Sequence, residues 1–287
     1  LKAGGKRLRP TVALLTAESL ADISTHELNY RSFPALDGSE IDVMSAATAI
    51  EVIQSFTLIH DDIMDEDDLR RGVPAVHQQY DTETAILAGD TLYAKAFELM
   101  SSTGADPANG TKAVHRLATT CTKICEGQAL DVEFERQQEV LPVEYLEMVE
   151  LKTAVLYGAA AATTAMLMDA SDKTIQAMYR YGIDAGCAFQ IQDDVLDLTV
   201  PSEELGKQRG SDLVENKETL ITLHARKHGT DVDALVPDTR VSEVSEEDID
   251  AAVESLRSTG SITYASEKAT ELVENAKGHL TVLPDNK

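Results

Sequence analysis

The chain is poor in the residues on which disulfide-rich and metal-thiolate proteins depend. Its 287 residues contain no Trp and three Cys, too few for a disulfide framework. Cys121 and Cys125 would share a helical face, but no His or further Cys at a suitable spacing completes a metal site with them. We therefore predict that Cys121, Cys125 and Cys187 are buried thiols outside any disulfide, in a reducing cytoplasm.

Segments that target or anchor a protein are also missing from the sequence. No apolar run reaches the roughly 18–20 residues that span a bilayer, so no membrane span is expected. The start, Leu1-Lys2-Ala3, has neither an initiator Met nor the apolar core of a signal peptide. We expect an opening helix to be missing from this end of the chain.

Positive charge is scarce as well. The chain has 25 Lys and Arg against 50 Asp and Glu, for a formal net charge of −25. Because duplex binding requires the neutralisation of phosphates, nucleic acid is not an expected partner. Charge of this size favours solubility at the cost of self-repulsion, a lever that halophiles use, and we expect a salt-loving source. The alternative is an ordinary acidic surface.

Helical periodicity accounts for most of the remaining sequence, and no convincing alternating strand appears. The apolar fraction of 43% is enough for a core, and the many Ala and Leu residues favour helix. The sequence predicts one all-α domain over residues 1–287, with His26–Glu40 and Gly229–Ser245 as surface insertions and Thr199–Gly210 as a polar loop. The predicted helices span Ile41–Ile63, Thr84–Ser101, Lys112–Phe134, Pro142–Met168, Ser171–Leu198, Glu246–Ser258 and Ile262–His279.

Two acidic clusters with the same internal spacing carry the main chemical signal. Asp61-Asp62-Ile63-Met64-Asp65 ends one predicted helix, and Asp193-Asp194-Val195-Leu196-Asp197 lies near the C-terminal end of another. The first and last Asp of each cluster are four positions apart, which puts them on one helical face roughly 5–6 Å from each other. A lone cluster of this kind is usually a solvated helix end. Two that follow apolar stretches predict a clamp for Mg²⁺, which takes oxygen ligands and leaves positions open for phosphates.

An anionic ligand needs concentrated positive charge in so acidic a chain. Arg suits phosphate because it forms two parallel hydrogen bonds, and Lys acts as a mobile point charge. On spacing alone, Lys152 also fits a surface Lys on an Ala-rich helix. Basic residues stand at the N-terminus and after both clusters, and the candidates for a diphosphate site are Lys6, Arg7, Arg9, Arg70, Arg71, Lys152, Lys207 and Lys217.

The chain resembles the trans-isoprenyl diphosphate synthases, or polyprenyl synthetases, and most closely the archaeal geranylgeranyl diphosphate synthases. The resemblance implies an all-α, isoprenoid-synthase-type helical bundle around a central cavity, with the two acidic motifs facing each other across it, and a homodimer. The matching segments, in order, are GGKRLRP at Gly4–Pro10, HDDIMDEDDLRRG at His60–Gly72, AILAGDTLYAKAFE at Ala85–Glu98, GQALDVEFE at Gly127–Glu135, LKTAVLYGAA at Leu151–Ala160, FQIQDDVLD at Phe189–Asp197 and GKQRGSDLVENKETL at Gly206–Leu220.

The resemblance also implies roles for individual residues. With substrate bound, Asp61, Asp62 and Asp65 would hold two Mg²⁺ ions, and Asp193, with Asp194 and Asp197 nearby, a third. Isopentenyl diphosphate would bind to Lys6, Arg9 and Arg71, and Gln54 takes a position where the family has His or Gln. The allylic diphosphate would be held by Arg70, Lys152, Thr153, Gln190, Lys207 and Lys217. Catalysis is expected to depend chiefly on Asp61, Asp65, Arg70, Lys152, Asp193 and Lys207.

The implied reaction joins isopentenyl diphosphate to an allylic primer, which is dimethylallyl, geranyl or farnesyl diphosphate. Phe56, five residues before Asp61 and therefore about 7.5 Å deeper along the helix, takes the place of the aromatic that floors the cavity in archaeal C20 synthases. By itself, an isolated Phe on a helix would be plain core. We expect geranylgeranyl diphosphate as the main product, with C15 and C25 products as competitors.

Three other readings remain open. A class I terpene cyclase would ionise the same substrates, but cyclases generally replace the second acidic motif and lack GGKRLRP. A non-catalytic subunit of a heteromeric synthase would usually have eroded acidic motifs. The third reading is an acidic helical interaction protein without chemistry. We expect His60 and His77 to be structural in all of these cases.

Overall fold

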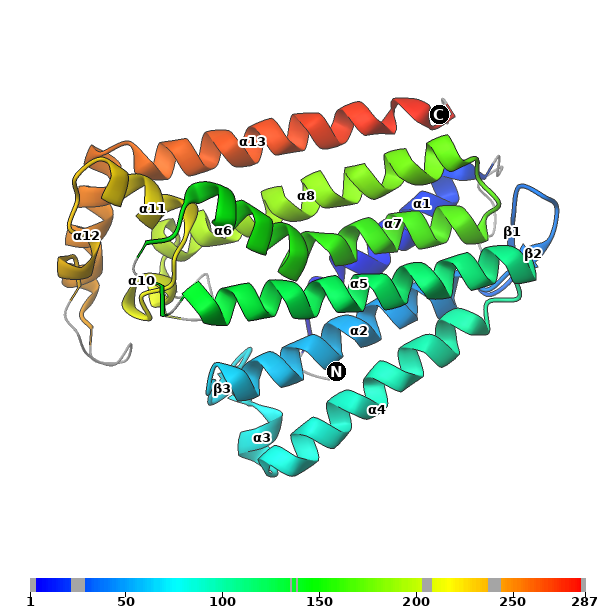
Figure 1. The fold of residues 1–287 in the computed structure, drawn as a ribbon, viewed down its shortest axis with the longest axis horizontal. Helices are drawn as coiled ribbons and strands as arrows, with labels where there is room; N and C mark the ends of the chain where they lie inside the picture. Colours follow the sequence, from blue (N-terminus) through cyan, green and yellow to red (C-terminus); the bar gives the residue numbers. More distant parts are fainter. Residues whose placement is uncertain are drawn as a thin grey trace. The chain divides into compact units, whose positions relative to one another are not determined.

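The computed structural model describes residues 4–21, 29–134, 136–137, 139–202, 208–236 and 244–284 (Figure 1). The all-α prediction is confirmed. Among these residues, strands are confined to two antiparallel pairs of two residues each. In one, β1 (Phe33–Pro34) pairs with β2 (Glu40–Ile41), and in the other, β3 (Leu69–Arg70) pairs with β4 (Val73–Pro74).

The chain divides into two compact units, and each is described by itself. Unit 1 comprises Leu1–Thr122, Val155–Ile183 and Ala276–Lys287, and unit 2 comprises Lys123–Ala154 and Asp184–Asn275. Three of the four boundaries fall inside long helices, α5 (Pro107–Phe134), α8 (Asp172–Thr199) and α13 (Ser261–His279). The prediction of a single domain over residues 1–287 stays a prediction.

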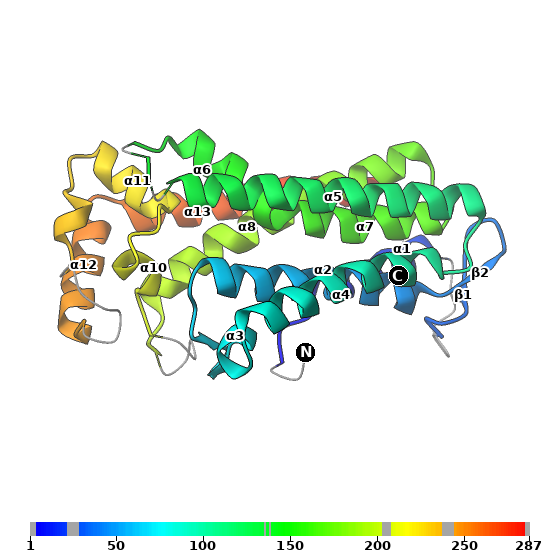
Figure 2. The same cartoon turned by 60° about the horizontal axis from the view of Figure 1, so that its bottom comes forward.

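Unit 1 is built around α2 (Val43–Met64), the helix that ends in the first acidic motif. It packs along α4 (Thr82–Ser101) and also contacts α1 (Leu8–Leu20) and α7 (Val155–Leu167). The α2–α4 pair lies side by side in both views (Figure 1 and Figure 2). The carboxylates of Asp42 and Asp81 cap α2 and α4 by accepting from the backbone N–H three residues on, which satisfies donors that helices leave open at their start. The short α3 (Val76–Gln79) precedes α4, and η4 (Leu280–Val282) follows α13.

The four consecutive alanines at 159–162 lie on α7, where small side chains allow neighbouring helices to pack closely. All of its residues are buried, and Gly158 on α7 meets Gly182 on α8. A Cβ added to Gly182 would lie 2.5 Å from the Cα of Gly158 and 2.4 Å from the carbonyl oxygen of Tyr157. The close packing of α7 against α8 therefore requires Gly at position 182.

Unit 2 carries the second acidic motif on the C-terminal part of α8. Its shorter elements are α6 (Pro142–Val149), η1 (Glu150–Ala154), α10 (Ser211–Val214), α11 (Leu220–Lys227), η2 (Val232–Ala234) and α12 (Glu246–Ser258). α12 begins where the sequence predicts, because Ser245 and Asp248 form a reciprocal capping box at its start. α11 packs on α6 and α12.

Several predictions of local structure are wrong in instructive ways. The helix predicted over Pro142–Met168 is interrupted by a π-helix, η1, which is one residue wider per turn. The segment His26–Glu40 is not only a surface insertion, because Phe33 and Ala35 are buried in unit 1. Four helices of the described residues, α1, α3, α10 and α11, were not predicted. Of the three cysteines, Cys121 and Cys187 are buried as expected, whereas Cys125 is exposed.

One helix in the described part of the chain, α2, is long and apolar enough to cross a membrane by length and composition. This differs from the expectation that no apolar segment reaches spanning length. Of its most apolar window, 44% is buried inside the fold. A core helix of a folded protein passes the same test.

Candidate active site

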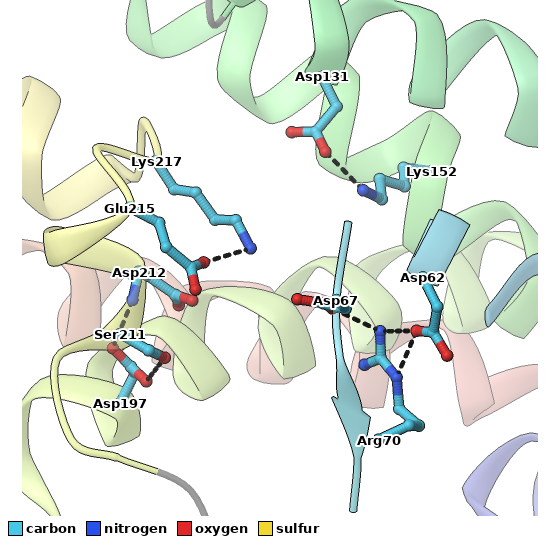
Figure 3. A network of polar contacts seen from close by, with 10 residues as sticks. All are labelled: Asp62, Asp67, Arg70, Asp131, Lys152, Asp197, Ser211, Asp212, Glu215 and Lys217. Atoms are coloured by element: carbon cyan, nitrogen blue, oxygen red, sulfur yellow. Dashed lines mark hydrogen bonds and ion pairs between the residues drawn. The ribbon is translucent and has the colours of Figure 1, made fainter. Parts of the chain in front are cut away.

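The first acidic motif lies at the C-terminal end of α2, and its carboxylates differ in exposure. Asp62 is 3% exposed and accepts two hydrogen bonds from the guanidinium of Arg70, one of them 2.7 Å from Nε (Figure 3). The same guanidinium donates to Asp67, 3.0 Å away. Burial alone would lower the pKa of Arg70, but the hydrogen bond to Asp62 and the surrounding carboxylates raise it. Asp61 and Asp65 are half-exposed, so they are more accessible than Asp62.

The second acidic motif divides in the same way. Asp193 is exposed, whereas Asp194 and Asp197 are 5% and 1% exposed. The hydroxyl of Tyr145 donates to one carboxylate oxygen of Asp194, and the amide nitrogen of Gln190 donates to the other at 2.9 Å. Burial raises the pKa of Asp194 to about 7, and the charge of Asp212 adds to the rise.

Asp197 holds the segment that follows the second motif. Its carboxylate accepts from Ser211 Oγ at 3.0 Å and from the backbone N–H of Asp212 at 3.3 Å, and its backbone carbonyl accepts from Gly210 N (Figure 3). The buried carboxylate thus satisfies the open donors at the start of α10. This arrangement fixes the position of Asp212 next to the motif.

A pocket of about 170 Å³ in unit 2 is lined by four of the six residues expected to hold the allylic diphosphate. Its walls include side chains from α5, α6, η1, α8 and the segment after α10. Among the residues named from the sequence, it is lined by Lys152, Thr153, Gln190, Asp193, Asp194 and Lys217. Sequence reasoning missed Asp131, Tyr145 and Asp212, which also line it. Asp131 and Asp212 stand inside the motifs GQALDVEFE and GKQRGSD, which could have drawn attention to them.

The π-helix presents Lys152 and Thr153 to this pocket together. Lys152 Nζ donates to the carboxylate of Asp131 on α5 at 2.5 Å (Figure 3). Thr153 Oγ1 donates to Gln190 Oε1 at 3.2 Å. α5 can approach this closely because residue 127 is Gly: a Cβ there would lie 2.3 Å from the backbone nitrogen of Lys152. Two hydrogen-bonded groups therefore line the same pocket, Lys152 with Asp131 and Thr153 with Gln190 and Asp194.

The predicted isopentenyl diphosphate residues lie in unit 1. The guanidinium of Arg71 donates to the carbonyl of Gly4 and rests against Gly5, so it adjoins the GGKRLRP segment. Lys6 is exposed at the same segment. Arg9 stacks over the ring of Tyr157 at 4.4 Å, and burial lowers the pKa of Arg9 although Tyr157 and Glu51 oppose this. Its Nε has no hydrogen-bond partner among the described residues.

Phe56 and Gln54 are both half-buried on α2. The Phe56 ring packs edge-on against His60 and against Tyr93 of α4, with centroids 4.9 and 5.2 Å away. His60 in turn reaches the carbonyl of Ile86 at 3.2 Å, which agrees with a structural role. The role of Phe56 in product length stays a prediction.

Of the site residues predicted from the sequence, Lys207 lies outside the residues that the structure describes. The two acidic motifs belong to different units, so the expectation that they face each other also stays a prediction.

The carboxylates of Asp61, Asp65 and Asp193 suit a hard divalent cation by their chemistry, since Mg²⁺ takes oxygen ligands and often completes its shell with substrate phosphates. Within the described ranges, no three His, Cys, Asp or Glu side chains are grouped closely enough to hold a metal ion by themselves. A metal bound by Asp61, Asp65 or Asp193 would therefore take further ligands from a diphosphate or water.

Comparison with known proteins identifies the family. Residues 1–256 match the family model described as polyprenyl synthetase. The chain is 64% identical over its whole length to the geranylfarnesyl diphosphate synthase of Natronomonas pharaonis, of which it covers 83%.

Solved structures agree with this match. Geranylgeranyl pyrophosphate synthetase of Geoglobus acetivorans superposes with a TM-score of 0.86 at 42% identity, covering 99% of this chain and 84% of that one. The polyprenyl synthase of Caulobacter crescentus, complexed with calcium and isoprenyl diphosphate, gives 0.81 at 31% identity, covering 100% of this chain and 81% of that one. The chain belongs to the polyprenyl synthetase family and is a trans-prenyltransferase.

Proposed function

We propose that this chain is a Mg²⁺-dependent synthase that condenses isopentenyl diphosphate with allylic diphosphates, mainly to geranylgeranyl diphosphate. The observation that carries the proposal is the pocket of unit 2. In a chain of net charge −25, two lysines, Lys152 and Lys217, line one cavity together with the exposed carboxylate of Asp193. Two lysines by themselves would attract any anion. The carboxylate of Asp193 in the same pocket adds a ligand for a divalent metal ion next to the bound anion.

The metal ligands in this proposal are the half-exposed carboxylates of Asp61 and Asp65 and the exposed carboxylate of Asp193. When bound, Mg²⁺ neutralises the charge that builds on the departing diphosphate. The buried carboxylates instead orient neighbouring groups through hydrogen bonds. Asp62 accepts from Arg70, Asp194 accepts from both Tyr145 and Gln190, and Asp197 accepts from the backbone at the start of α10. We therefore propose that the three more accessible carboxylates bind the metal directly, and that Asp62, Asp194 and Asp197, which the sequence also predicts as ligands, position neighbouring groups instead.

The reaction needs no protein nucleophile, so the basic side chains contribute by stabilising the negative charge of the diphosphate groups. The allylic carbon–oxygen bond breaks, and its electron pair leaves with the diphosphate, which Lys152, Lys217 and Arg70 stabilise. The double bond of isopentenyl diphosphate then forms the new carbon–carbon bond, and a proton is lost from that substrate to the released diphosphate. Lys6, Arg9 and Arg71 would hold the diphosphate of the acceptor, which stays intact.

Product length follows from Phe56, whose ring is braced by Tyr93 behind it. An aromatic side chain on the first-motif helix favours a C20 product, as the family resemblance implies. A C25 product is the second candidate, because the relative from Natronomonas pharaonis at 64% identity is a geranylfarnesyl diphosphate synthase.

We also propose that the protein works as a homodimer in the cytoplasm of a salt-loving organism. Exposed apolar side chains on α4, such as Ile86 and Leu87 at 42% and 65% exposure, support a covered face there. The net charge of −25 supports the source.

The test is a transfer assay in molar KCl with Mg²⁺, ¹⁴C-isopentenyl diphosphate and each of the three primers, with products sized after dephosphorylation. We expect labelled C20 alcohol, lost on chelation of the metal. No transfer with any primer would refute the proposal. Hydrocarbons formed without incorporation of label would indicate a cyclase, and activity that requires a second chain would indicate a subunit.

A further inference from the structure

Gln128 is a buried carboxamide to which the proposed chemistry gives no role. Its side chain is 7% exposed, and neither its nitrogen nor its oxygen has a hydrogen-bond partner among the described residues. Most buried polar atoms in proteins are paired, and an unpaired one destabilises the fold. An apolar side chain of the same size would remove that cost, so packing does not account for a Gln here.

The position of Gln128 on α5 points to a function. It precedes Asp131 by three residues, and residues at that spacing share a helix face. Asp131 lines the pocket and accepts from Lys152, while Gly127 touches the backbone of Lys152. The carboxamide thus stands one turn beyond the last charged residue of the pocket wall that α5 provides. Ile124, the next residue of this face, is apolar and buried.

We propose that Gln128 contacts the allylic substrate at its reacting carbons, with Oε1 directed at the positive charge that develops as the carbon–oxygen bond breaks. The proposal rests on the function proposed above. The electron pair of that bond leaves with the diphosphate, and Nε2 donates to one of the departing oxygens. Both orphaned atoms of the carboxamide thereby gain partners only when substrate is bound.

A carboxamide suits this task better than the other polar side chains. Its oxygen stabilises a cation through a fixed dipole, in surroundings where such interactions are stronger than in water. A carboxylate in the same place would pair with Lys152 and could capture the cation. A hydroxyl would offer less acceptor strength from a shorter side chain.

Gln128→Leu separates this role from a structural one. Because it removes an unsatisfied buried amide, the variant should unfold at the same temperature as the parent or a few degrees higher. The turnover number kcat should fall by about 10- to 100-fold, as it does when one preorganised stabilising group is removed. KM for both substrates should change by less than about three-fold, because the lost contact forms in the transition state.

The experiment compares Gln128→Leu and Gln128→Met with Gln176→Leu, which makes the same change at an exposed position of α8. Met is included because its unbranched outline matches that of Gln, should Leu disturb the packing. Thermal unfolding and single-turnover kinetics are measured in molar KCl. A third measurement is the binding of an ammonium analogue of the allylic cation together with inorganic diphosphate and Mg²⁺, against a neutral analogue of the same shape.

We expect the Gln128 variants to lose at least ten-fold in affinity for the ammonium analogue and to bind the neutral one unchanged, with Gln176→Leu like the parent. A lower unfolding temperature with unchanged kcat would show that an ordered water or packing explains Gln128, and would overturn the inference. Equal losses for both analogues would do the same. A parent chain without any transfer activity would refute the proposed function itself, and the inference with it.

Discussion

The hydroxyl of Tyr145 on α6 lies 2.5 Å from the buried carboxylate of Asp194 on α8. Tyr145 is 1% exposed and Asp194 is 5% exposed, so neither group can turn to water instead. Tyr145→Phe should therefore lower the free energy of unfolding by about 1–3 kcal/mol, because a buried acceptor loses its donor. Chemical denaturation in molar KCl measures the loss. Tyr264→Phe, at a position 38% exposed, is the control, and an equal loss in both variants would contradict the prediction.

The approach of α5 to the π-helix depends on Gly127. In Gly127→Ala the new Cβ would lie 2.3 Å from a backbone nitrogen, which cannot move without shifting Lys152. We expect a loss of about 1–3 kcal/mol in stability and a large fall in kcat. Gly110→Ala on the same helix meets nothing within 4 Å and should gain up to about 1 kcal/mol, because Ala favours helix. Equal stability of the two variants would argue against the close contact.

The two classes of aspartate in the second motif should respond differently to substitution. Asp193→Asn removes an exposed carboxylate, and we expect the Mg²⁺ concentration for half-maximal activity to rise about 10-fold or more, with unchanged unfolding. Asp197→Asn weakens the cap of α10 and should cost about 0.5–2 kcal/mol of stability. Magnesium titrations and unfolding curves on both variants check this. If Asp197→Asn alone shifts the magnesium response, the assignment of ligands is wrong.

Phe56→Ala should lengthen the product by one or more isoprene units, because it removes the aromatic ring that Tyr93 braces. The dephosphorylated products are sized by mass spectrometry. Phe97→Ala is the matched control, because Phe97 also packs edge-on against Tyr93, with ring centroids 5.0 Å apart. An unchanged product from Phe56→Ala would remove Phe56 from the control of chain length.

Stability should depend steeply on salt. With a net charge of −25, self-repulsion is strongest at low ionic strength, where the screening length is about 30 Å at 0.01 M and falls to about 3 Å at 1 M. The midpoint of thermal unfolding should therefore rise from low to molar KCl. A flat profile would favour an ordinary acidic surface over a halophilic one.

The helices were predictable from the sequence where the helical spacing of apolar residues coincides with a capping residue at the start of the helix. α12 has the predicted bounds because its apolar stripe coincides with a Ser–Asp capping box. α1 escaped prediction because apolar residues and small polar ones alternate on it without a clear stripe, being covered by both α2 and α7. The π-helix could not be foreseen, because it reflects the approach of Gly127, which is distant in sequence.

The sequence predicted which residues belong to the candidate site better than it predicted what each of them does. The motifs pointed to Asp61 and Asp62 alike, and only the structure shows that Asp62 is buried against Arg70 while Asp61 is half-exposed. Tyr145 gave no signal, since a Tyr in an amphipathic helix looks like core until its hydroxyl is seen on Asp194.

The wide turn at Glu150–Ala154 is equivalent to a single extra residue accommodated within an otherwise regular helix. Deleting one residue there would let α6 and α7 join as an uninterrupted α-helix while both keep their phase against their neighbours. Such a shortened protein would fold but no longer display a cationic and a hydroxyl side chain on consecutive, splayed positions. We therefore expect such a deletion to abolish transfer activity while the helices around it keep their packing.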